Sequence, residues 1–296
     1  MNKMVGETEE EAVDACCANC GIAEVDDIKL KDCDGCDLVK YCGDKCREEH
    51  REQHEEDCKT RAQELHDDDL FTQPYGSHLG ECPLCFLPMP LDPTKCAYYS
   101  CCSELICNGC RYAHGRNNGG DRCPFCREPI AGAEENNKRR MKRIKANDPA
   151  ALCNMGLECT NKGDHDSAVK YWKKAAELGD VGAHYQLADS YYEGYGVEKD
   201  EEKEIYHYEK AAMGGHHQAR YNLGCVEHNN GNIERAVKHF IIAANIGYEK
   251  SMKLLWGYYK DRNITKEDLD ATLRTHHAAI NEMKGPEREA AEKALS

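Results

Sequence analysis

Eight closely spaced pairs of metal-binding side chains lie in the first 126 residues of this 296-residue chain. Fifteen of these sixteen side chains are cysteines and one is a histidine. Thiolate sulfur and imidazole nitrogen at such spacings are the usual ligands of structural zinc, which takes four of them. The sequence therefore predicts four zinc ions, two in each of two successive series. The first series is Cys17, Cys20, Cys33, Cys36, Cys42, Cys46, His54 and Cys58; the second is Cys82, Cys85, Cys101, Cys102, Cys107, Cys110, Cys123 and Cys126.

The cysteines divide the chain into a metal-rich half and an ordinary half, because 17 of the 20 precede residue 127. The opening sequence, MNKMVGETEEEAVD, has no apolar segment of the signal-peptide kind, and no apolar run of about 18 residues could span a bilayer. We therefore expect a cytoplasmic protein with no membrane association. In that reducing compartment closely spaced cysteines hold metal, whereas a disulfide-rich secreted module is the alternative interpretation.

Charge and segment length limit what the metal-rich half can do. Segments of about 40 to 50 residues bury too little apolar surface to fold unaided, so we expect folding and zinc binding to be one event. The formal net charge is −15. Deprotonated ligands around four divalent ions would bring it to about −22. Such a charge argues against nucleic acid as a general partner, so we expect protein partners.

The first series resembles a MYND finger. Its hallmark is the ending YCGDKCREEHREQHEEDC, in which a Cys-x3-Cys pair is followed by a helix carrying His54 and Cys58. Residues four apart on a helix lie one turn above each other, so both can face one ion. Cys16 is an alternative ligand to Cys17, although the two-residue gap to Cys20 favours Cys17.

The resemblance to MYND fingers implies interleaved ligation and a peptide-docking role without catalysis. One zinc ion is expected to bind Cys17, Cys20, Cys42 and Cys46, and the other Cys33, Cys36, His54 and Cys58.

The second series resembles a RING finger from Cys82 to Ile130, through CPLC, CCSELICNGC and CPFCREPI. The resemblance implies that Leu84 and Pro124 form an apolar patch for a ubiquitin-conjugating enzyme, while Arg127 hydrogen-bonds that enzyme and ubiquitin. Such a clamp acts by orienting the reactive thioester, so no catalytic residue is predicted. The alternative interpretation is that Leu84 and Pro124 only shape the zinc loops.

One position departs from the RING pattern. Glu104 stands where that pattern has a histidine, and the adjacent Cys101 and Cys102 are the expected third and fourth ligands because sulfur suits zinc. Cys96 and His114 remain as substitutes. The stretch RYAHGRNNGG lacks the large apolar residue of many ligases, and its Gly-rich end predicts a short, mobile loop. By resemblance, one zinc ion takes Cys82, Cys85, Cys107 and Cys110, and the other takes Cys101, Cys102, Cys123 and Cys126.

Two connectors separate the predicted modules. Residues 67–80 combine an acidic run with QPYGSHLG, the composition of an exposed linker. Residues 133–147, expected to be a basic linker or helix, carry six Lys or Arg from Lys138 to Lys145. That cluster is a candidate nuclear import signal, with a solvated helix as the alternative interpretation.

From residue 148 the sequence repeats. Small residues recur at Ala151, Ala183, Ala219 and Ser251, and each unit ends in a glycine suited to a left-handed turn after a helix. The middle unit, AHYQLADSYYEGYGVEKDEEKEIYHYEKAAMGG, resembles a Sel-1-like repeat, a relative of the tetratricopeptide repeat. We expect about three helix pairs and closing helices, with caps at Asp148-Pro149 and Thr265-x-x-Asp268.

A helical solenoid of this kind is expected to bind proteins on its concave face. A tyrosine-rich run could line that face or pack between repeats, and packing is the favoured role for most of it. The run consists of Tyr185, Tyr191, Tyr192, Tyr195, Tyr206 and Tyr208.

The predicted chain is therefore multi-domain, with two small zinc-stabilised modules followed by an all-α helical-repeat solenoid. The functional prediction is a RING-type ubiquitin ligase, a ubiquitin-protein transferase that recruits substrate through the MYND finger and the repeats. The alternatives are a non-catalytic zinc-dependent adaptor or scaffold and, with only the basic cluster in support, a chromatin-associated regulator. The predicted boundaries are a disordered N-terminus at 1–15, the MYND-like finger at 16–66, a linker at 67–80, the RING-like finger at 81–132, the basic segment at 133–147 and the repeats at 148–296.

Overall fold

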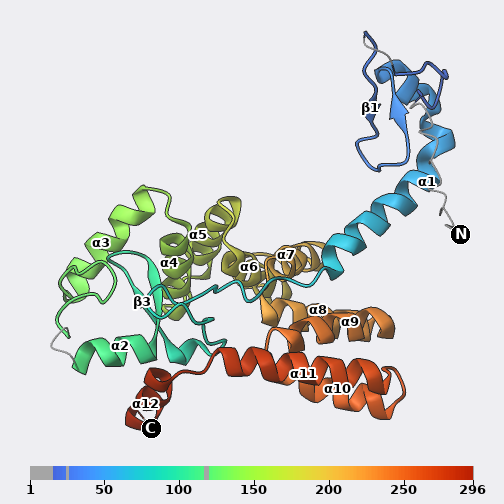
Figure 1. Cartoon of the computed structure of the whole chain (residues 1–296). Coiled ribbons are helices and arrows are strands. Elements are labelled where there is room, and N and C mark those ends of the chain that lie inside the picture. The colour runs from blue at the N-terminus through green and yellow to red at the C-terminus, as the bar shows by residue number, and fades with distance from the viewer. Residues whose placement is uncertain (1–15, 25–26, 117–119, 296) are drawn as a thin grey trace, which may run out of the picture. The chain divides into compact units, whose positions relative to one another are not determined.

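The computed structural model describes residues 16–24, 27–116 and 120–295 (Figure 1). The predicted disordered N-terminus, 1–15, and the centre of the predicted mobile loop, 117–119, lie outside the described residues. The chain divides into two compact units, Met1–Leu70 and Phe71–Ser296. No helix in the described residues combines the length and the apolar character needed to cross a bilayer.

The first unit is a small hairpin with one long helix. Strands β1 (Lys31–Asp32) and β2 (Lys40–Tyr41) pair antiparallel, and helix α1 runs over Asp44–Phe71. Apart from Leu70, the only buried side chain of α1 is His54. A helix with no apolar stripe gains little from packing, so its attachment to the hairpin depends on the metal-binding side chains. The helix includes the acidic run that the sequence assigned to an exposed linker.

The second unit contains the solenoid predicted from the sequence (Figure 1). Three antiparallel helix pairs follow one another and two further helices close the stack. A final short helix, α12 (Pro286–Leu295), lies beyond them. The pairs are α4 (Pro149–Asn161) with α5 (His165–Glu177), α6 (Val181–Glu193) with α7 (Glu201–Met213), and α8 (His217–Asn229) with α9 (Ile233–Asn245); the closing helices are α10 (Glu249–Lys260) and α11 (Lys266–Glu282).

Local signals in the repeats are confirmed. The four small residues Ala151, Ala183, Ala219 and Ser251 are fully buried. Asp148 accepts a hydrogen bond from Ala151 N as the cap of α4, and Thr265 accepts one from Asp268 N as the cap of α11. The repeat-ending glycines are left-handed, with φ of 85°, 85° and 102° at Gly179, Gly215 and Gly247.

Within each outer pair a glycine faces an aromatic ring. A Cβ added at Gly156 would lie 2.2 Å from Trp172 Nε1, and one added at Gly224 would lie 2.6 Å from Phe240 Cε1. Trp172 and Phe240 are both buried. The missing side chain on the first helix therefore makes room for the large ring on the second.

The tyrosine-rich run divides between the two predicted roles. Tyr191 and Tyr208 are buried, whereas Tyr192, Tyr195 and Tyr206 are each at least half exposed. Tyr208 donates to Asp189 Oδ1 at 2.6 Å and so ties α7 to α6. The exposed three lie on the middle repeat.

The second cysteine-rich module packs within the second unit. It consists of the 3₁₀ turn η1 (Pro93–Lys95), the antiparallel strands β3 (Cys96–Tyr99) and β4 (Glu104–Cys107), and helix α2 (Asn108–His114). Its small core includes Met89 and Ile106 among the cysteines. Helix α3 (Ala133–Lys145) then leads into the repeats.

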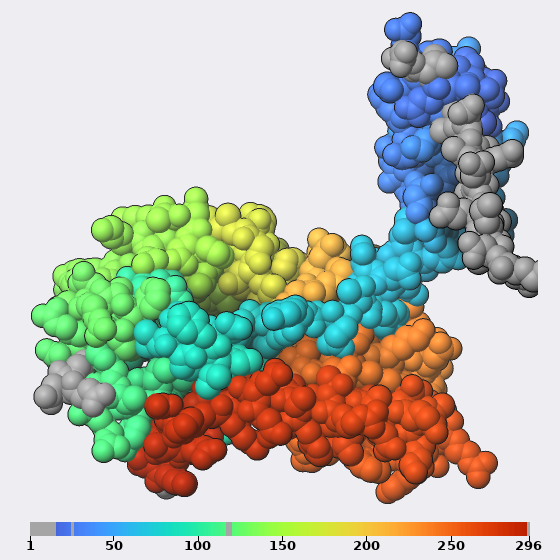
Figure 2. All heavy atoms as spheres, in the orientation of Figure 1, coloured from blue at the N-terminus to red at the C-terminus, as the bar shows by residue number. Residues whose placement is uncertain are grey.

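The segment 72–80, here called the strap, lies along the repeats (Figure 2). His78 N donates to Gly215 O at 3.1 Å, and the His78 ring stacks on His216 at 4.2 Å. The strap backbone can approach the repeats closely because Gly215 has no Cβ. A Cβ added there would lie 2.6 Å from Gly76 O. The prediction of an exposed linker is therefore wrong for His78, because tertiary contacts with the repeats, not local composition, determine where this segment lies.

Stability should fall in mild acid because histidines are buried where the strap meets the repeats. Burial lowers the pKa of His217 to about 3 and that of His78 to about 4, so the folded state resists protonation. The unfolded chain takes up these protons as the pH falls through about 6.5. The contribution of each neutral imidazole to folding stability is therefore complete above about pH 6.5, and it is lost progressively as the pH falls below that value.

We expect His217→Leu to reduce this acid sensitivity. Lowering the pH from 7 to 5 should destabilise the wild type by about 2 kcal/mol more than the variant. Urea unfolding of the repeats at both pH values measures the difference, and zinc loss common to both proteins cancels in the comparison. Equal pH dependence in the two proteins would contradict the assignment.

Gly224→Ala should destabilise the repeats although alanine is the better helix former. Forcing a methyl group against Phe240 should cost about 1–3 kcal/mol in the free energy of unfolding. The matched control is Gly257→Ala on α10, where an added Cβ meets nothing within 4 Å. That control should gain up to about 1 kcal/mol. Urea unfolding checks both, and a stabilising Gly224→Ala would disprove the packing argument.

Candidate metal centres

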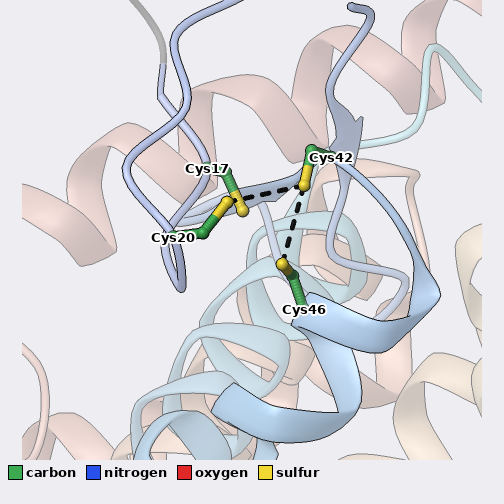
Figure 3. A group of neighbouring side chains, drawn as sticks. All are labelled: Cys17, Cys20, Cys42 and Cys46. Carbon is green, nitrogen blue, oxygen red and sulfur yellow. Dashed lines mark hydrogen bonds between the residues drawn. The ribbon is translucent and has the colours of Figure 1, made fainter.

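The first centre in the first unit brings together the four cysteines predicted for it. The sulfurs of Cys17, Cys20, Cys42 and Cys46 all lie within 4.8 Å of one another and point toward a common centre (Figure 3). Cys42 Sγ is 3.6 Å from both Cys20 Sγ and Cys46 Sγ. Tetrahedral zinc with Zn–S bonds of about 2.3 Å needs sulfurs about 3.8 Å apart. The residues therefore fit a zinc ion.

The second centre joins the hairpin to helix α1. Cys36 Sγ lies 3.2 Å from His54 Nε2, and Cys33 Sγ lies 3.6 Å from Cys58 Sγ. His54 and Cys58 are one helical turn apart, as their spacing predicted. The hairpin cysteines approach closely because of Gly35, where an added Cβ would lie 3.0 Å from Cys58 Sγ.

The second module holds two further groups of four cysteines, with the interleaved grouping that the resemblance to RING fingers implied. In one group the Sγ atoms of Cys82 and Cys110, and those of Cys85 and Cys107, are 3.8 Å apart. In the other, Cys102 Sγ is 3.8 Å from Cys123 Sγ, and Cys101 Sγ is 3.4 Å from Cys126 Sγ. Both groups fit the zinc geometry.

The alternative ligands left open by the sequence lie outside these groups. Cys16 is exposed and belongs to no group of ligands among the described residues. Cys96 Sγ contacts Pro90 O at 3.7 Å, and His114 Nε2 lies 3.1 Å from Arg122 O. The structure thus favours Cys101 and Cys102 as the third and fourth ligands.

Similar tight turns present three of the cysteine pairs. In each, the residue after the second cysteine is left-handed, namely Gly21 with φ 72°, Phe86 with φ 57° and Arg127 with φ 65°. The turn closes when the amide of that residue donates to the carbonyl of the first cysteine, at 2.9, 2.8 and 3.1 Å respectively. This conformation is unusual for side chains larger than glycine, so Phe86 and Arg127 also serve the geometry of their turns.

The electrostatics of the thiol groups favours a bound cation. Burial opposes ionisation of Cys17, but backbone amides such as that of Cys20 lower its pKa to about 6. Burial and the neighbouring sulfur of Cys33 raise the pKa of Cys58 to about 12. Three or four sulfurs this close cannot all ionise without a positive charge among them, and a divalent ion supplies that charge.

The residues predicted to contact a conjugating enzyme do not form one exposed patch. Leu84 is half-buried against the module's core, Pro124 is buried and Arg127 is exposed. Two exposed apolar side chains lie directly beside zinc ligands instead, namely Phe86 and Phe125, at 72% and 43% exposure. Sequence reasoning missed both, although their positions beside the second and last ligands mark them as residues of the zinc loops. The partner role of the predicted three stays a prediction.

The basic cluster from Lys138 to Lys145 is helical and partly engaged. Arg143 donates to Cys101 O through Nε and Nη2 at 3.2 and 3.1 Å, and Arg140 forms an ion pair with Glu158 of α4. These arginines join the second module to the repeats. A role of this cluster in nuclear import stays a prediction. Because Arg140 and Arg143 are engaged in these contacts, that role would depend on the exposed lysines.

Comparison with known proteins identifies two of the three predicted modules. Residues 17–58 match the MYND finger, and residues 149–180, 181–216 and 217–248 match the Sel1 repeat. The chain therefore carries a MYND zinc finger and three Sel1 repeats. No RING family was found for the second series of cysteines.

The curated relatives match over short segments. Two components from Arabidopsis thaliana, ERAD-associated E3 ubiquitin-protein ligase component HRD3B and its counterpart HRD3A, are 40% identical over 76 residues and 36% identical over 84 residues. The matches cover 25% and 27% of this chain and 12% of each relative, so the chain spans only a small part of their length.

Two solved structures resemble the repeats. A Sel1 repeat protein from Oxalobacter formigenes is 24% identical, with a TM-score of 0.44 over 63% of this chain and 86% of its own. The protective antigen c5321 of uropathogenic Escherichia coli, which has an SLR fold, is 21% identical, with a TM-score of 0.40 over 63% and 39%.

The adjacent cysteines at 16 and 17 give a sharp test of the first centre. We expect Cys17→Ser to lower the zinc content by one to two ions per chain, because a lost ligand opens one site and weakens the shared hairpin. Cys16→Ser should leave the content at four. Elemental analysis of the purified full-length proteins measures the zinc content. A loss of zinc in Cys16→Ser would show that Cys16, not Cys17, is the ligand.

Proposed function

We propose that this protein is a zinc-dependent scaffold for protein interactions, built on a MYND finger, a second zinc-binding module and a Sel1 solenoid. The observation that carries the proposal is the grouping of the sixteen ligands into four sets of zinc geometry. Their spacing is that of closed structural sites, in which all four positions are protein ligands and no position remains for a substrate.

The first finger offers a concave surface for a partner. A cavity of about 540 Å³ lies beside its second centre, between the hairpin and α1. Tyr41 and His54 contribute to its wall, and Arg47 and Arg51 lie beside acidic side chains around it. Such a mixed polar and aromatic lining suits a peptide segment.

On the solenoid, part of the surface is covered by the strap and part is free. The strap occupies part of the repeats near Gly215 and His216, so those residues are covered by the chain itself. The exposed rings of Tyr192, Tyr195 and Tyr206 lie on the middle repeat instead. Large aromatic side chains are enriched in protein interfaces, and we assign the partner surface of the solenoid to these three.

A second candidate function is the RING-type ubiquitin ligase predicted from the sequence. The interleaved ligand grouping and the exposed Arg127 support it, and two relatives matched at the repeats are named as components of a ubiquitin ligase. The burial of Pro124 counts against it, because that side chain offers no surface to a conjugating enzyme in this conformation. The scaffold is therefore the better supported function.

A ubiquitination assay distinguishes the two. Zinc-loaded full-length protein is incubated with ubiquitin-activating enzyme, a panel of conjugating enzymes, ubiquitin and ATP. The scaffold predicts no chains above background. The ligase predicts chains that Leu84→Ala and Arg127→Ala each reduce at least about tenfold. The first would remove an apolar contact with the conjugating enzyme, and the second a hydrogen bond that orients the thioester.

The matched control is Tyr75→Ala, which changes a fully exposed strap residue. Chains that are insensitive to all three substitutions would reject the assigned ligase surface. Ubiquitin chains that are reduced by Leu84→Ala and Arg127→Ala but not by Tyr75→Ala would overturn the scaffold proposal.

A further inference from the structure

Arg288 of helix α12 lies against the metal centre formed by Cys82, Cys85, Cys107 and Cys110. Its Nη2 is 3.5 Å from Cys85 Sγ, and its side chain is only 8% exposed. Both terminal nitrogens also donate to backbone carbonyls. Nη1 donates to Pro88 O at 2.7 Å and to Met283 O at 2.6 Å, and Nη2 donates to Leu87 O at 3.2 Å.

The contact between Arg288 and Cys85 places a positive charge beside a negatively charged metal centre. Four thiolates around one divalent ion carry a net charge of about −2. A buried cation that donates to one of the sulfurs lowers the cost of that charge and fixes the orientation of the ligand. Arginine suits this position because its guanidinium remains protonated when buried and can satisfy several acceptors at once.

The surfaces around Arg288 are shaped to bring α12 close. At Gly109, within α2 and next to the ligand Cys110, an added Cβ would lie 2.7 Å from Arg288 N and Cγ. At Gly285, immediately before α12, an added Cβ would lie 2.9 Å from Leu87 Cδ1. Two glycines, one on each side of the contact, therefore permit an approach that any larger residue would obstruct.

A second polar contact lies further along the helix. Lys95 Nζ, on η1 of the second module, is 2.6 Å from Glu292 Oε1. Ala291, between the two polar contacts, is buried. Figure 2 shows α12, in red, packed against the module, in green. The helix thus contacts the module along its length, not at one side chain alone.

We infer that α12 is a structural part of the second metal module, in which Arg288 supports the zinc site from outside the ligand shell. Zinc binding and docking of the C-terminal helix are then linked. If docking of the helix increases the zinc affinity of this site by some factor, zinc binding increases the equilibrium constant for docking of the helix by the same factor. Loss of zinc from this site releases α12, and loss of α12 weakens the site. This inference goes beyond the scaffold proposal and holds whether the module binds partners or acts as a ligase.

The first experiment changes the arginine and measures the metal. Full-length Arg288→Met, Arg288→Lys and the control Arg274→Met, at an exposed position of α11, are first compared for zinc content and repeat helicity. Zinc release to a chromogenic chelator is then followed. We expect Arg288→Met to release the ion of this site about 10–100-fold faster, because outer contacts of that kind tune metal affinity by such factors.

Arg288→Lys keeps the charge but loses the multiple hydrogen bonds, so its release rate should fall between wild type and Arg288→Met. Release from the MYND sites serves as an internal reference and should not change. A rate for Arg288→Met equal to that of Arg274→Met would overturn the inference.

The second experiment changes the metal site and measures the helix, so it does not depend on the folding of an Arg288 variant. Cys110→Ser removes a ligand from the supported site, and Cys46→Ser removes one from the MYND finger as the matched control. Hydrogen exchange of 286–295 is followed in both full-length proteins.

We expect the amides of α12 to exchange at least tenfold faster in Cys110→Ser and at the wild-type rate in Cys46→Ser. Unchanged protection in Cys110→Ser would show that α12 docks independently of zinc and would refute the linkage. Faster exchange in both variants would refute it as well, because the effect would not belong to this site.

Discussion

Three or four sulfurs gathered within 4.8 Å of one another are stable as thiolates only around a cation, and the N-terminal half of this chain depends on that requirement. Neither module has an apolar core of ordinary size. In the first unit α1 carries no apolar stripe, and its one contribution to the interior besides Leu70 is the ligand His54. In the second module the cysteines themselves make up much of the buried cluster around Ile106. Metal coordination takes the place of hydrophobic burial as the main source of folding free energy.

The repeats depend on the opposite principle, since their stability comes from close packing of small residues against rings. Gly156 with Trp172 and Gly224 with Phe240 are equivalent contacts in the first and third repeats. In the middle repeat the buried Tyr208 fills the corresponding role and reaches Asp189 through its hydroxyl group. One chain thus combines a half that folds with metal and a half that folds by packing.

The sequence was informative wherever a feature depended on neighbours close in the chain. Cysteine spacing predicted the ligand pairs, and the repeat-ending glycines and the caps at Asp148 and Thr265 followed from local backbone chemistry. Which pairs share a zinc ion came only from the resemblance to MYND and RING fingers. Sequence reasoning failed where segments distant in sequence meet. Nothing in QPYGSHLG indicates that His78 will stack on His216, because the recess at Gly215 exists only once the repeats have folded.

Arg288 is the extreme case of that failure. It is 203 positions from Cys85, and its sequence context, PEREAAEK, is that of an ordinary charged helix. The same limit applies to Pro124, since the spacing of the last cysteine pair gives its place in the loop but not the packing that buries it.

These long-range contacts change how the second module is understood. As a zinc finger between two flexible linkers it would move independently of the repeats. Instead, Arg143 ties it to the start of the solenoid at Cys101 O, and Arg288 ties it to the end of the chain at Cys85. Each tie reaches a ligand of a different zinc centre, one through a backbone carbonyl and the other through a sulfur. The two zinc centres therefore lie at the two points where these arginines join the module to the helical half.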